Sequence, residues 1–538
     1  MLLRSKKIST RSKILLFILS FLFLTITFVQ KFLISQKNVI SSFSISDFKG
    51  KDFLTESETK WSKILNRQSQ NLSAAAEEYK RRYKGRLPPK GFDKWWQFTQ
   101  DHGVKLVDEY DQIFKDLEPF WAIPSYRIRE LVEELQNRKN RKSIVYEFTK
   151  QRGNFTKTGP SAESPRAEKL LNLIQSFTDY AQDEFLDFKW VIDSEDGAQI
   201  RISWKEKDEL LKLARNGEVI DLEKHKSLSK GLSWPGSCPI NSPAYYSNTT
   251  PDRTKLRTLI YDHSKSMDLC MNPDQVQIHG AFMSQLYRTA QSINPIFCFS
   301  KSTLDSDILV TPLEQYESIY PDPAYEWKDP NRINQVFWRG SSTGKLLNVT
   351  KSINESLKKT VKGKEIKSKN YKFDVEFAGE PIQCSKLVCK KLRKIAKFGE
   401  WVEPRISNLY KYALDVDGNG WSGRFHRLLS SNQVVIKSTI FPEWYTDRIQ
   451  PWFHYVPLKL DYSDLPEIID YLMNHDNVSE KIARNGKEWA EKFWREEDMA
   501  AYMFRLMLEW SRLYNRKNCE MNKKTLRIEC PFLDFTMD

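Results

Sequence analysis

A glycine-rich loop followed by arginine is the part of this sequence that most directly indicates chemistry. Residues 411–416 are apolar and aromatic and predict a strand, residues 417–423 contain three glycines, and the six residues after them have helical spacing. A loop that opens a helix presents unpaired backbone N–H groups and the positive end of the helix dipole. We therefore predict an anion site, for a phosphate, at Ser422, Gly423 and Arg424. The alternative is a glycine-rich turn with surface arginines.

A second predicted strand end carries the same residue types. In 336–344, VFWRGSSTG, a strand is followed by an arginine, two glycines and three hydroxyl residues. Charge-assisted and neutral donors of this kind suit a diphosphate, and the spacing is not that of a Walker loop. Arg339, Gly340, Ser341 and Ser342 are the candidates here. The alternative is a capped helix with an ion-paired arginine.

Carboxylates follow a third predicted strand. In 190–197, WVIDSEDG, the acidic residues are Asp193, Glu195 and Asp196. A carboxylate at a strand end can act as a general base when it reaches the acceptor hydroxyl. An aspartate that caps the turn before Gly197 is the alternative interpretation.

The letters Asp415-Val416-Asp417 form a DxD sequence, which can hold a divalent metal ion. Asp415, however, lies inside the predicted strand, and the negative charge of a diphosphate can be neutralised by arginines and helix N-termini instead. We therefore predict no metal site and no metal requirement.

Several of these segments resemble glycosyltransferase family 90, the capsule-associated-protein-like family that includes Rumi-type protein O-glucosyltransferases and fungal β-1,2-xylosyltransferase relatives. The segments are YKYALDVDGNGWSGRFHRLL, VVIKSTIFPEWYTD, PWFHYVPLKLDYSDL, FWRGSSTG, IYDHSKSMDLC and SWPGSCP. A weaker resemblance to the fungal branch covers LPPKGFDKWWQF and YDQIFKDLEPFW.

The resemblance implies an α/β fold with two Rossmann-like domains facing a cleft, similar to the glycosyltransferase B arrangement. It implies that Asp196 is the catalytic base, with Asp193 or Glu195 as the choice if the register slips. This sequence has Gly197 and Ala198 where the family has an Asp-x-Pro context. Arg339, Ser341 and Ser342 would contact the donor phosphates, and Glu443 would line the nucleoside pocket.

The function implied is an inverting transfer of xylose or glucose from a UDP-sugar to a hydroxyl of a glycan or glycoprotein. The donor is a substrate, and no cofactor is expected. A membrane-anchored, catalytically inactive glycan-binding protein is the alternative.

The 538 residues carry a formal net charge of +14 and are 40% hydrophobic, which indicates a folded protein with a basic surface. Many of the cations lie in the N-terminal tail and in 351–397. Because no zinc-finger spacing or RNA-binding signature is present, we do not expect nucleic acid as a partner.

The N-terminus predicts a membrane anchor. Basic residues precede the largely apolar run 14–34, which at 1.5 Å per residue is long enough to span a bilayer core. We expect an uncleaved signal anchor in type II orientation, with the catalytic body in the lumen of the Golgi or endoplasmic reticulum.

Sequons and cysteines agree with a lumenal body. The six sequons are at Asn71, Asn154, Asn248, Asn348, Asn354 and Asn477. The seven cysteines allow up to three disulfides, and closeness in sequence favours Cys384 with Cys389 and Cys519 with Cys530.

The chain is predicted to divide into a cytosolic tail (1–13), an anchor (14–34), a stem (35–70), a helical extension (71–165), an acceptor-side domain (166–330), a nucleotide-sugar domain (331–514) and a tail (515–538). Within them we expect a surface linker made of 137–142 and 151–165, a helix over 168–185, and strands at 187–192, 296–299, 307–310, 335–338 and 455–460. Ser463 is the expected N-cap of the C-terminal helices.

Overall fold

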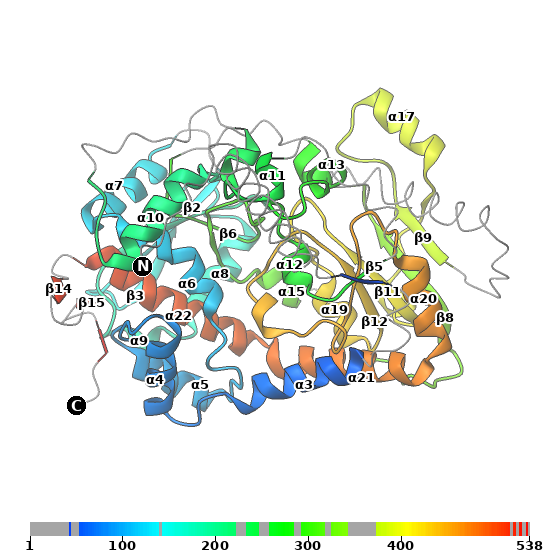
Figure 1. The fold of residues 1–538 in the computed structure, drawn as a ribbon, viewed down its shortest axis with the longest axis horizontal. Coiled ribbons are helices and arrows are strands. Elements are labelled where there is room, and N and C mark those ends of the chain that lie inside the picture. The colour runs from blue at the N-terminus through cyan, green and yellow to red at the C-terminus, as the bar shows by residue number, and fades with distance from the viewer. Residues whose placement is uncertain are drawn as a thin grey trace, which may run out of the picture.

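The computed structural model describes residues 42–44, 53–138, 142–221, 233–246, 258–283, 292–317, 324–342, 373–516, 520–522, 527–529 and 534–535. These residues form a mixed α/β structure around two main sheets, which lie in the left and right halves of Figure 1. The α/β class predicted from the sequence is confirmed.

The first sheet has the strand order β3-β2-β4-β6-β7. Its strands are β2 (Ser143–Thr149), β3 (Asn154–Thr158), β4 (Phe188–Asp193), β6 (Ile296–Cys298) and β7 (Ile308–Leu309). Strand β2 is antiparallel to β3 and β4, whereas β4, β6 and β7 are parallel. Trp190, Val191 and Ile192 are all fully buried, as expected when helices cover both faces of a sheet.

The second sheet is parallel throughout, with the order β10-β9-β8-β11-β12-β13. Its strands are β8 (Ile333–Gly340), β9 (Phe373–Ala378), β10 (Phe398–Gly399), β11 (Tyr410–Val416), β12 (Val434–Ser438) and β13 (Val456–Pro457). Phe337 of β8 pairs with Ala413 of β11, so the carboxyl ends of these two strands meet at one edge. Ligands bind at such edges in parallel sheets.

Helices surround both sheets. Before β4 they are α3 (Phe53–Asn66), α4 (Leu72–Arg82), α5 (Phe92–Asp101), α6 (Asp111–Leu117), η1 (Glu118–Ala122), α7 (Ser125–Gln136), α8 (Pro165–Gln175) and α9 (Thr178–Ala181). Between β4 and β8 they are α10 (Trp204–Asn216), η2 (Trp234–Ser237), α11 (Pro243–Tyr246), α12 (His263–Ser266), α13 (Gln275–Ile278), α14 (Gly280–Met283) and α15 (Leu313–Glu317).

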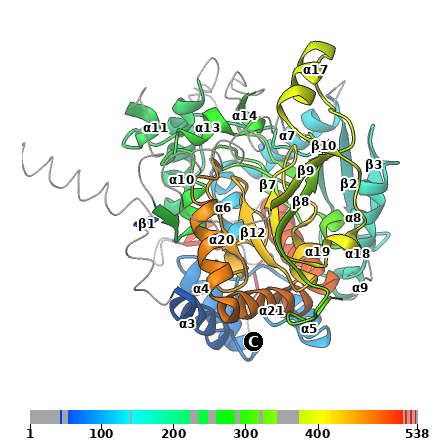
Figure 2. The ribbon, with the colours of Figure 1, turned by 90° about the vertical axis from the view of Figure 1, so that its right-hand side faces the viewer.

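The later helices are α17 (Lys386–Ile395), α18 (Pro404–Ser407), α19 (Phe425–Ser430), η5 (Thr446–Arg448), α20 (Leu465–Asn474), α21 (Asp476–Phe493) and α22 (Glu496–Asn515). Two small antiparallel pairs are β1 (Ser42–Ser44) with β5 (Thr258–Ile260), and β14 (Glu520–Asn522) with β15 (Arg527–Glu529). Figure 2 shows α17 projecting from the body of the molecule beyond β9 and β10.

Local sequence explains where the helices that frame the site begin. The Ser164 hydroxyl accepts from the Ala167 N–H at the start of α8, and Pro165 occupies its first position. The Ser203 hydroxyl caps α10 in the same way, and Gly217 ends that helix with a φ of 73°, in the left-handed region that glycine adopts readily.

Helix α22 returns to the first sheet although the helices before it pack on the second. The indole of Trp510 on α22 donates to the Lys189 carbonyl of β4, and that of Trp95 on α5 donates to the Ala501 carbonyl of α22. By contrast, Ile468 of α20 and Ile482 of α21 lie in the core under the second sheet. The predicted boundaries place α22 with the second domain, whereas its packing ties it to the first.

The predicted linker at 151–165 is wrong for part of its length. Residues 154–158 form β3, which pairs with β2, and β2 in turn pairs with β4. The predicted boundary at residue 165 therefore falls between strands of one sheet. The helix predicted over 168–185 is also interrupted, because α8 ends at Gln175 and the separate α9 begins at Thr178.

The stem predicted at 35–70 contains a helix that packs on the body. In α3, Trp61 is buried against His454 and Phe493, with ring centroids 4.5 and 5.2 Å away, and Glu58 pairs with Lys481 at 2.6 Å. Helix α3 accordingly runs beside α21 in Figure 1. Its amphipathic sequence between serine-rich segments explains why the stem interpretation overlooked it.

The other strand predictions are confirmed to within a few residues, except that 455–460 contains only the two residues of β13. The N-cap of α20 is Asp464 rather than Ser463. The Cys384–Cys389 disulfide is confirmed, an unpredicted Cys238–Cys270 disulfide is present, and Cys298 is free and buried.

Other expectations lie outside the described residues: the anchor at 14–34, the Cys519–Cys530 pair, and the sequons at Asn248, Asn348 and Asn354. Within the described part of the chain, no helix is both long and apolar enough to cross a membrane.

Candidate active site

The ends of β4, β6 and β11 meet at one place. Ser300, just beyond β6, is fully buried, and its hydroxyl donates to the Asp196 carbonyl at 2.7 Å. Gly420, in the loop after β11, lies so close to the Asp196 carbonyl and the Ser300 hydroxyl that neither leaves room for a Cβ atom. The predicted base loop from the first sheet therefore lies directly against the predicted phosphate loop from the second.

Asp196 is the member of the acidic trio whose side chain is half exposed at this junction. Its Oδ1 lies 3.1 Å from Arg166 Nη2, and Arg166 also donates to the Ser194 carbonyl at 2.6 Å and pairs with Glu314. The Arg166 guanidinium lies over the rings of Phe299 and Trp421, 4.9 and 5.4 Å from their centroids.

The two neighbouring acids are placed differently. Asp193 is buried, and its Oδ1 accepts from the Glu195 N–H, which makes it the turn cap that the alternative interpretation described. Glu195 points outward and pairs with Lys142 at 2.8 Å. Of the three, only Asp196 lies against the loop from the other sheet.

A buried carboxylate holds the segment that follows Asp196. Both oxygens of Asp307 accept backbone N–H groups, from Gln199 at 2.7 Å and Ile200 at 2.8 Å. Burial, with the neighbouring Asp305 charge, raises the pKa of Asp307 to about 7. Lys301 Nζ donates to the Asp307 carbonyl at 2.6 Å and is itself paired with Asp116. Buried charged groups therefore hold the backbone that follows Asp196 in position.

Arg424 occupies the edge where β8 and β11 end. Its Nη2 donates to the Val416 carbonyl at 2.9 Å, and its Nη1 lies 3.4 Å from the position of a Cβ on Gly340. Gly340 is also crowded by the Trp338 ring, at 2.7 Å from that position, so a larger residue would not fit. Among the described residues, the buried Arg424 Nε has no partner, which leaves a cationic donor available at the predicted phosphate position.

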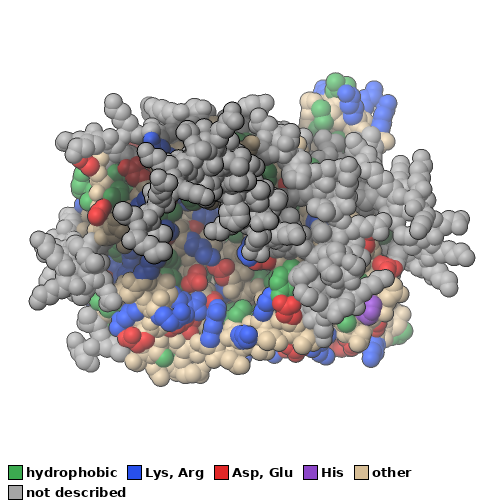
Figure 3. Space-filling view, viewed as in Figure 1, with side chains coloured by type: hydrophobic (Ala, Val, Ile, Leu, Met, Phe, Trp, Pro, Cys, Tyr) green, Lys and Arg blue, Asp and Glu red, His purple; other side chains and the backbone are tan. Residues whose placement is uncertain are grey.

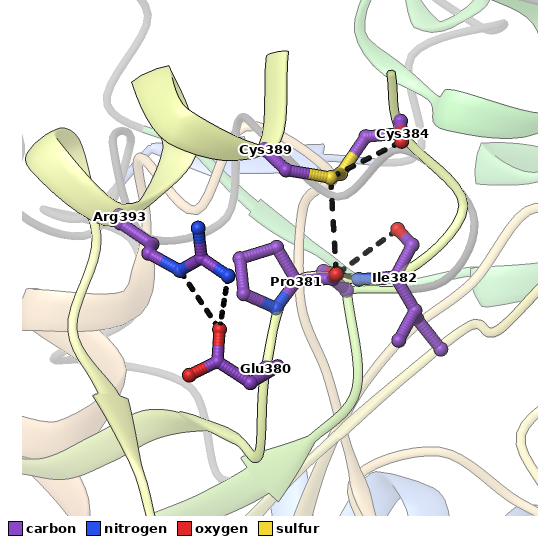
Figure 4. Close-up of a disulfide and its surroundings, with 7 residues drawn as sticks. Glu380, Pro381, Ile382, Cys384, Cys389 and Arg393 are labelled. Atoms are coloured by element: carbon purple, nitrogen blue, oxygen red, sulfur yellow. Dashed lines mark hydrogen bonds and ion pairs between the residues drawn. A yellow bond between two sulfur atoms is a disulfide. The ribbon is translucent and has the colours of Figure 1, made fainter. Parts of the chain in front are cut away.

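Two of the polar side chains at or just beyond the end of β8 are already bound to other protein groups. Arg339 pairs with Asp374 at 2.5 Å and lies 3.6 Å from Glu376, which is the ion-paired arrangement of the alternative interpretation. Ser342 is buried, and its hydroxyl accepts from the Ile382 N–H at 2.8 Å. Ser341 is partly exposed at the strand end. Figure 4 shows that Ile382 belongs to a segment closed by the Cys384–Cys389 disulfide.

A buried polar network lies behind the glycine loop. Lys437 of β12 pairs with Asp415 at 2.8 Å and lies 3.8 Å from Glu443. The Ser422 hydroxyl is hydrogen-bonded to Asp415, so it points into the protein, while a Cβ on Gly423 would meet open space.

Glu443 is a buried member of this network. Its two oxygens accept from Gln315 at 2.6 Å and from the Tyr445 hydroxyl at 2.5 Å. Burial raises the pKa of Glu443 to about 7, against the opposing effect of Lys437. Each oxygen has a second acceptor position, but the side chain is buried, so a ribose hydroxyl could reach it only after neighbouring side chains moved.

The two aspartates of the DxD letters take separate partners. Asp415 is bound by Lys437, whereas Asp417 Oδ2 lies 3.1 Å from His279 Nε2 and accepts from the Ile440 N–H at 3.1 Å. His279 Nδ1 accepts from the Ala281 N–H, so the ring proton lies on Nε2 and is donated to Asp417. In the described ranges, no three acidic, histidine or cysteine side chains converge on a potential metal position.

Sequence reasoning missed Arg166, Ser300, Lys437 and Gln315. Only Lys437 lay within a segment that had been singled out, and its place inside a buried strand signalled that it needed an acidic partner.

Comparisons with known proteins agree on one family. The model of the family described as Glycosyl transferase family 90 matches residues 265–532. Protein O-glucosyltransferase 2 of Danio rerio is 34% identical over 105 residues, which cover 19% of this chain and 21% of that protein. Protein O-glucosyltransferase 1 of Homo sapiens is 23% identical over 239 residues, which cover 40% of this chain and 57% of that protein.

The matches thus span about a fifth to just over half of the length of these relatives. Among solved structures, the crystal structure of TarM aligns with a TM-score of 0.25 and 14% identity over 40% of each chain, a likeness too low to inform fold or function.

Proposed function

Because this chain belongs to glycosyl transferase family 90, we propose that it transfers a sugar, xylose or glucose, from a UDP-sugar to a hydroxyl of a glycan or glycoprotein. The observation that carries the proposal is the contact of the Asp196 loop with Gly420. It brings a half-exposed carboxylate from one sheet to the phosphate-type loop of the other. A transferase needs such an arrangement, because the acceptor's base and the donor's diphosphate must flank one sugar carbon.

We propose that the two sheets are the centres of two Rossmann-like domains in a glycosyltransferase B-like arrangement. The donor would bind at the carboxyl edge of β8 and β11, where Arg424 and Gly340 meet. The acceptor would enter beside Asp196, between the first sheet and the loop after β11.

In the proposed reaction the Asp196 carboxylate takes the proton of the acceptor hydroxyl. The hydroxyl oxygen then attacks C1 of the sugar from the face opposite UDP, the C1–O bond to the diphosphate breaks, and the anomeric configuration inverts. The hydrogen bond from Ser300 to the Asp196 carbonyl and the Asp307 contacts that follow hold the carboxylate's segment in position. A general base typically contributes about 10²–10⁴-fold.

The departing UDP would be stabilised by Arg424, by backbone N–H groups of the 417–423 loop and by the groups after β8. Fixed donors aimed at a developing anion act without reorganisation, and one such donor is typically worth about 2.7–4 kcal/mol. Arg339 would take part only by leaving Asp374, so we assign the larger role to Arg424. We propose that no divalent metal is required, since Lys437 already neutralises Asp415.

We also propose that the protein is a single-pass type II membrane protein of the Golgi or endoplasmic reticulum with a lumenal body. The basic residues before the apolar run 14–34 support the orientation. Asn71, Asn154 and Asn477 are exposed in the structure, as acceptor asparagines for N-glycosylation must be. Glycans on these residues, and protection of the C-terminus from protease in sealed microsomes, are the expected results. Digestion of the C-terminus would contradict the topology.

The function is tested by UDP release. The full-length protein, incubated with UDP-xylose or UDP-glucose and with simple mannosides or folded protein acceptors, is expected to release UDP only with the matching acceptor. Asp196→Asn should bind UDP but not turn over. The configuration of the product, read by NMR, tests inversion, and loss of activity in EDTA with recovery in Mn²⁺ would contradict metal independence.

A second candidate is a catalytically inactive glycan-binding protein. The observation that favours it is the ion pair between Arg166 and Asp196, because a carboxylate that already accepts from a guanidinium has fewer acceptor positions left for the hydroxyl of an acceptor. Glycan binding without UDP release from any donor and acceptor would establish this candidate instead.

A further inference from the structure

Helix α17 presents an exposed surface that is both cationic and apolar. From 381 to 399 the chain contains five lysines and one arginine and no acidic residue. On α17 itself, Lys390, Lys391 and Lys394 are exposed. Figure 3 shows Lys and Arg side chains beside hydrophobic ones on the projecting α17.

The apolar side chains gather at the start of the helix. Leu387 is 65% exposed, Ile382 is 43% exposed and Val388 is 38% exposed. Leu392, by contrast, is 5% exposed and faces the body. The outer surface of α17 therefore has an apolar tip and lysines behind it, although most exposed helix surfaces are polar.

This surface is held in one shape. The Cys384–Cys389 disulfide joins the preceding segment to the first turn of α17, and Arg393 pairs with Glu380 at 2.5 Å (Figure 4). At the base of the segment, the Ile382 N–H donates to the Ser342 hydroxyl. A rigid surface loses little conformational entropy when it binds a partner.

We propose that α17 and its disulfide segment dock on a bilayer leaflet that contains anionic lipids, which for the lumenal body proposed above is the lumenal leaflet. Lysines attract acidic headgroups, while Leu387, Val388 and Ile382 can enter the boundary between headgroups and acyl chains, which is how amphipathic elements bind membrane surfaces. A soluble polyanion would use the lysines but leave the three apolar side chains in water. The proposal does not depend on glycosyl transfer.

Hydrogen exchange of the α17 backbone amides tests the proposal. The full-length protein is combined with vesicles of phosphatidylcholine alone or of phosphatidylcholine with phosphatidylserine. Exchange over α17 is expected to slow only with the acidic vesicles, and to recover at high salt. Equal exchange with both vesicles would overturn the proposal. Slowing by heparin but not by acidic vesicles would also overturn it, and would indicate a soluble anionic partner.

Matched variants separate the local surface from the net charge. Lys390→Glu with Lys391→Glu should weaken the vesicle-dependent protection by about fivefold or more per lysine. Lys205→Glu with Arg484→Glu changes the net charge equally on exposed positions of α10 and α21 and should leave it intact. Leu387→Ser should weaken protection, whereas Val219→Ser, at a 52% exposed apolar position elsewhere, should not. UDP release should be unchanged in all four variants, so failure here is distinguishable from failure of the proposed function.

Discussion

Gly420 and Asp196 are in such close contact that the Asp196 carbonyl oxygen overlaps the position where a Cβ on residue 420 would stand. The Ser300 hydroxyl, 2.5 Å from the same position, closes the space from the other side. The two loops come from different sheets and are more than 200 residues apart in sequence, so their contact sets the distance between the proposed base and the proposed phosphate site. Any side chain at position 420 must push these loops apart.

Gly420→Ala is therefore expected to lower kcat more than it lowers UDP affinity, because the Asp196 loop and the 417–423 loop are pushed apart while Arg424 keeps its contact with the Val416 carbonyl at the end of β11. Gly197→Ala is the matched control. It lies next to Asp196 in sequence, and a Cβ there would meet open space. Steady-state kinetics with UDP titration decides the matter, and an equal loss in both variants would contradict the role of the contact.

Asp196→Asn keeps the size of the side chain and removes its basicity. The transfer rate should fall by about 10²–10⁴-fold while UDP affinity persists. Asp193→Asn and Glu195→Gln should cost far less, since Asp193 caps a turn and Glu195 pairs with Lys142 at the surface. A collapse of turnover in either neighbour, with Asp196→Asn near normal, would show that the register is wrong.

The sequence predicted those parts of the site whose residues are close together along the chain. The loop after β11 was predictable because its strand, glycines and arginine lie within about 20 residues of one another. The hydrogen-bonded residues Gln315 and Glu443, by contrast, are 128 positions apart in sequence. Arg166 and Asp196 are 30 positions apart, and Arg166 directly follows the predicted linker. Contacts of this kind depend on the tertiary fold.

The errors in the fold have a similar cause. Residues 143–149 (SIVYEFT) and 154–158 (NFTKT) are two strand-like runs separated by a turn at Gly153, which is a hairpin pattern, but the nearby glycine, proline and serine residues favoured a linker. The return of α22 to the first sheet could not be predicted. The helix is buried almost all round in the structure, so its sequence has no single apolar face that would indicate one sheet.

A buried carboxylate that is not among the proposed site residues provides a test of pH dependence. Burial raises the pKa of Asp464, at the start of α20, to about 7, above its ordinary value near 3.9. The stability that this group contributes is therefore fully present below about pH 4 and is lost as the pH rises through about 7. Asp464→Asn cannot titrate, so its free energy of unfolding relative to wild type should rise by up to about 1.4 kcal/mol per pH unit across that range.

The measurement is the melting temperature of both proteins at about pH 5 and about pH 7. Asp470→Asn, at an exposed position on the same helix, is the control and should follow wild type at both pH values. If the difference between Asp464→Asn and wild type does not change with pH, the carboxyl does not titrate in this range.

Arg424→Ala should weaken UDP binding and reduce kcat by about 10²–10³-fold, because it removes a fixed cation from the developing diphosphate. Arg427→Ala is the matched control on the same helix, since Arg427 instead donates to Ser407 and Asn408 at 3.1 Å each. It should leave UDP affinity near that of wild type.

Arg339→Ala tests whether the donor phosphates bind at the end of β8 or beside the glycine loop after β11. Because Arg339 is already bound by Asp374 and lies near Glu376, its removal should affect UDP binding less than the removal of Arg424. Isothermal titration with UDP on all three variants gives the order directly. If Arg339→Ala abolishes binding and Arg424→Ala does not, Arg339 leaves its acidic partners when the donor arrives, and the phosphates bind at the end of β8 rather than beside the glycine loop.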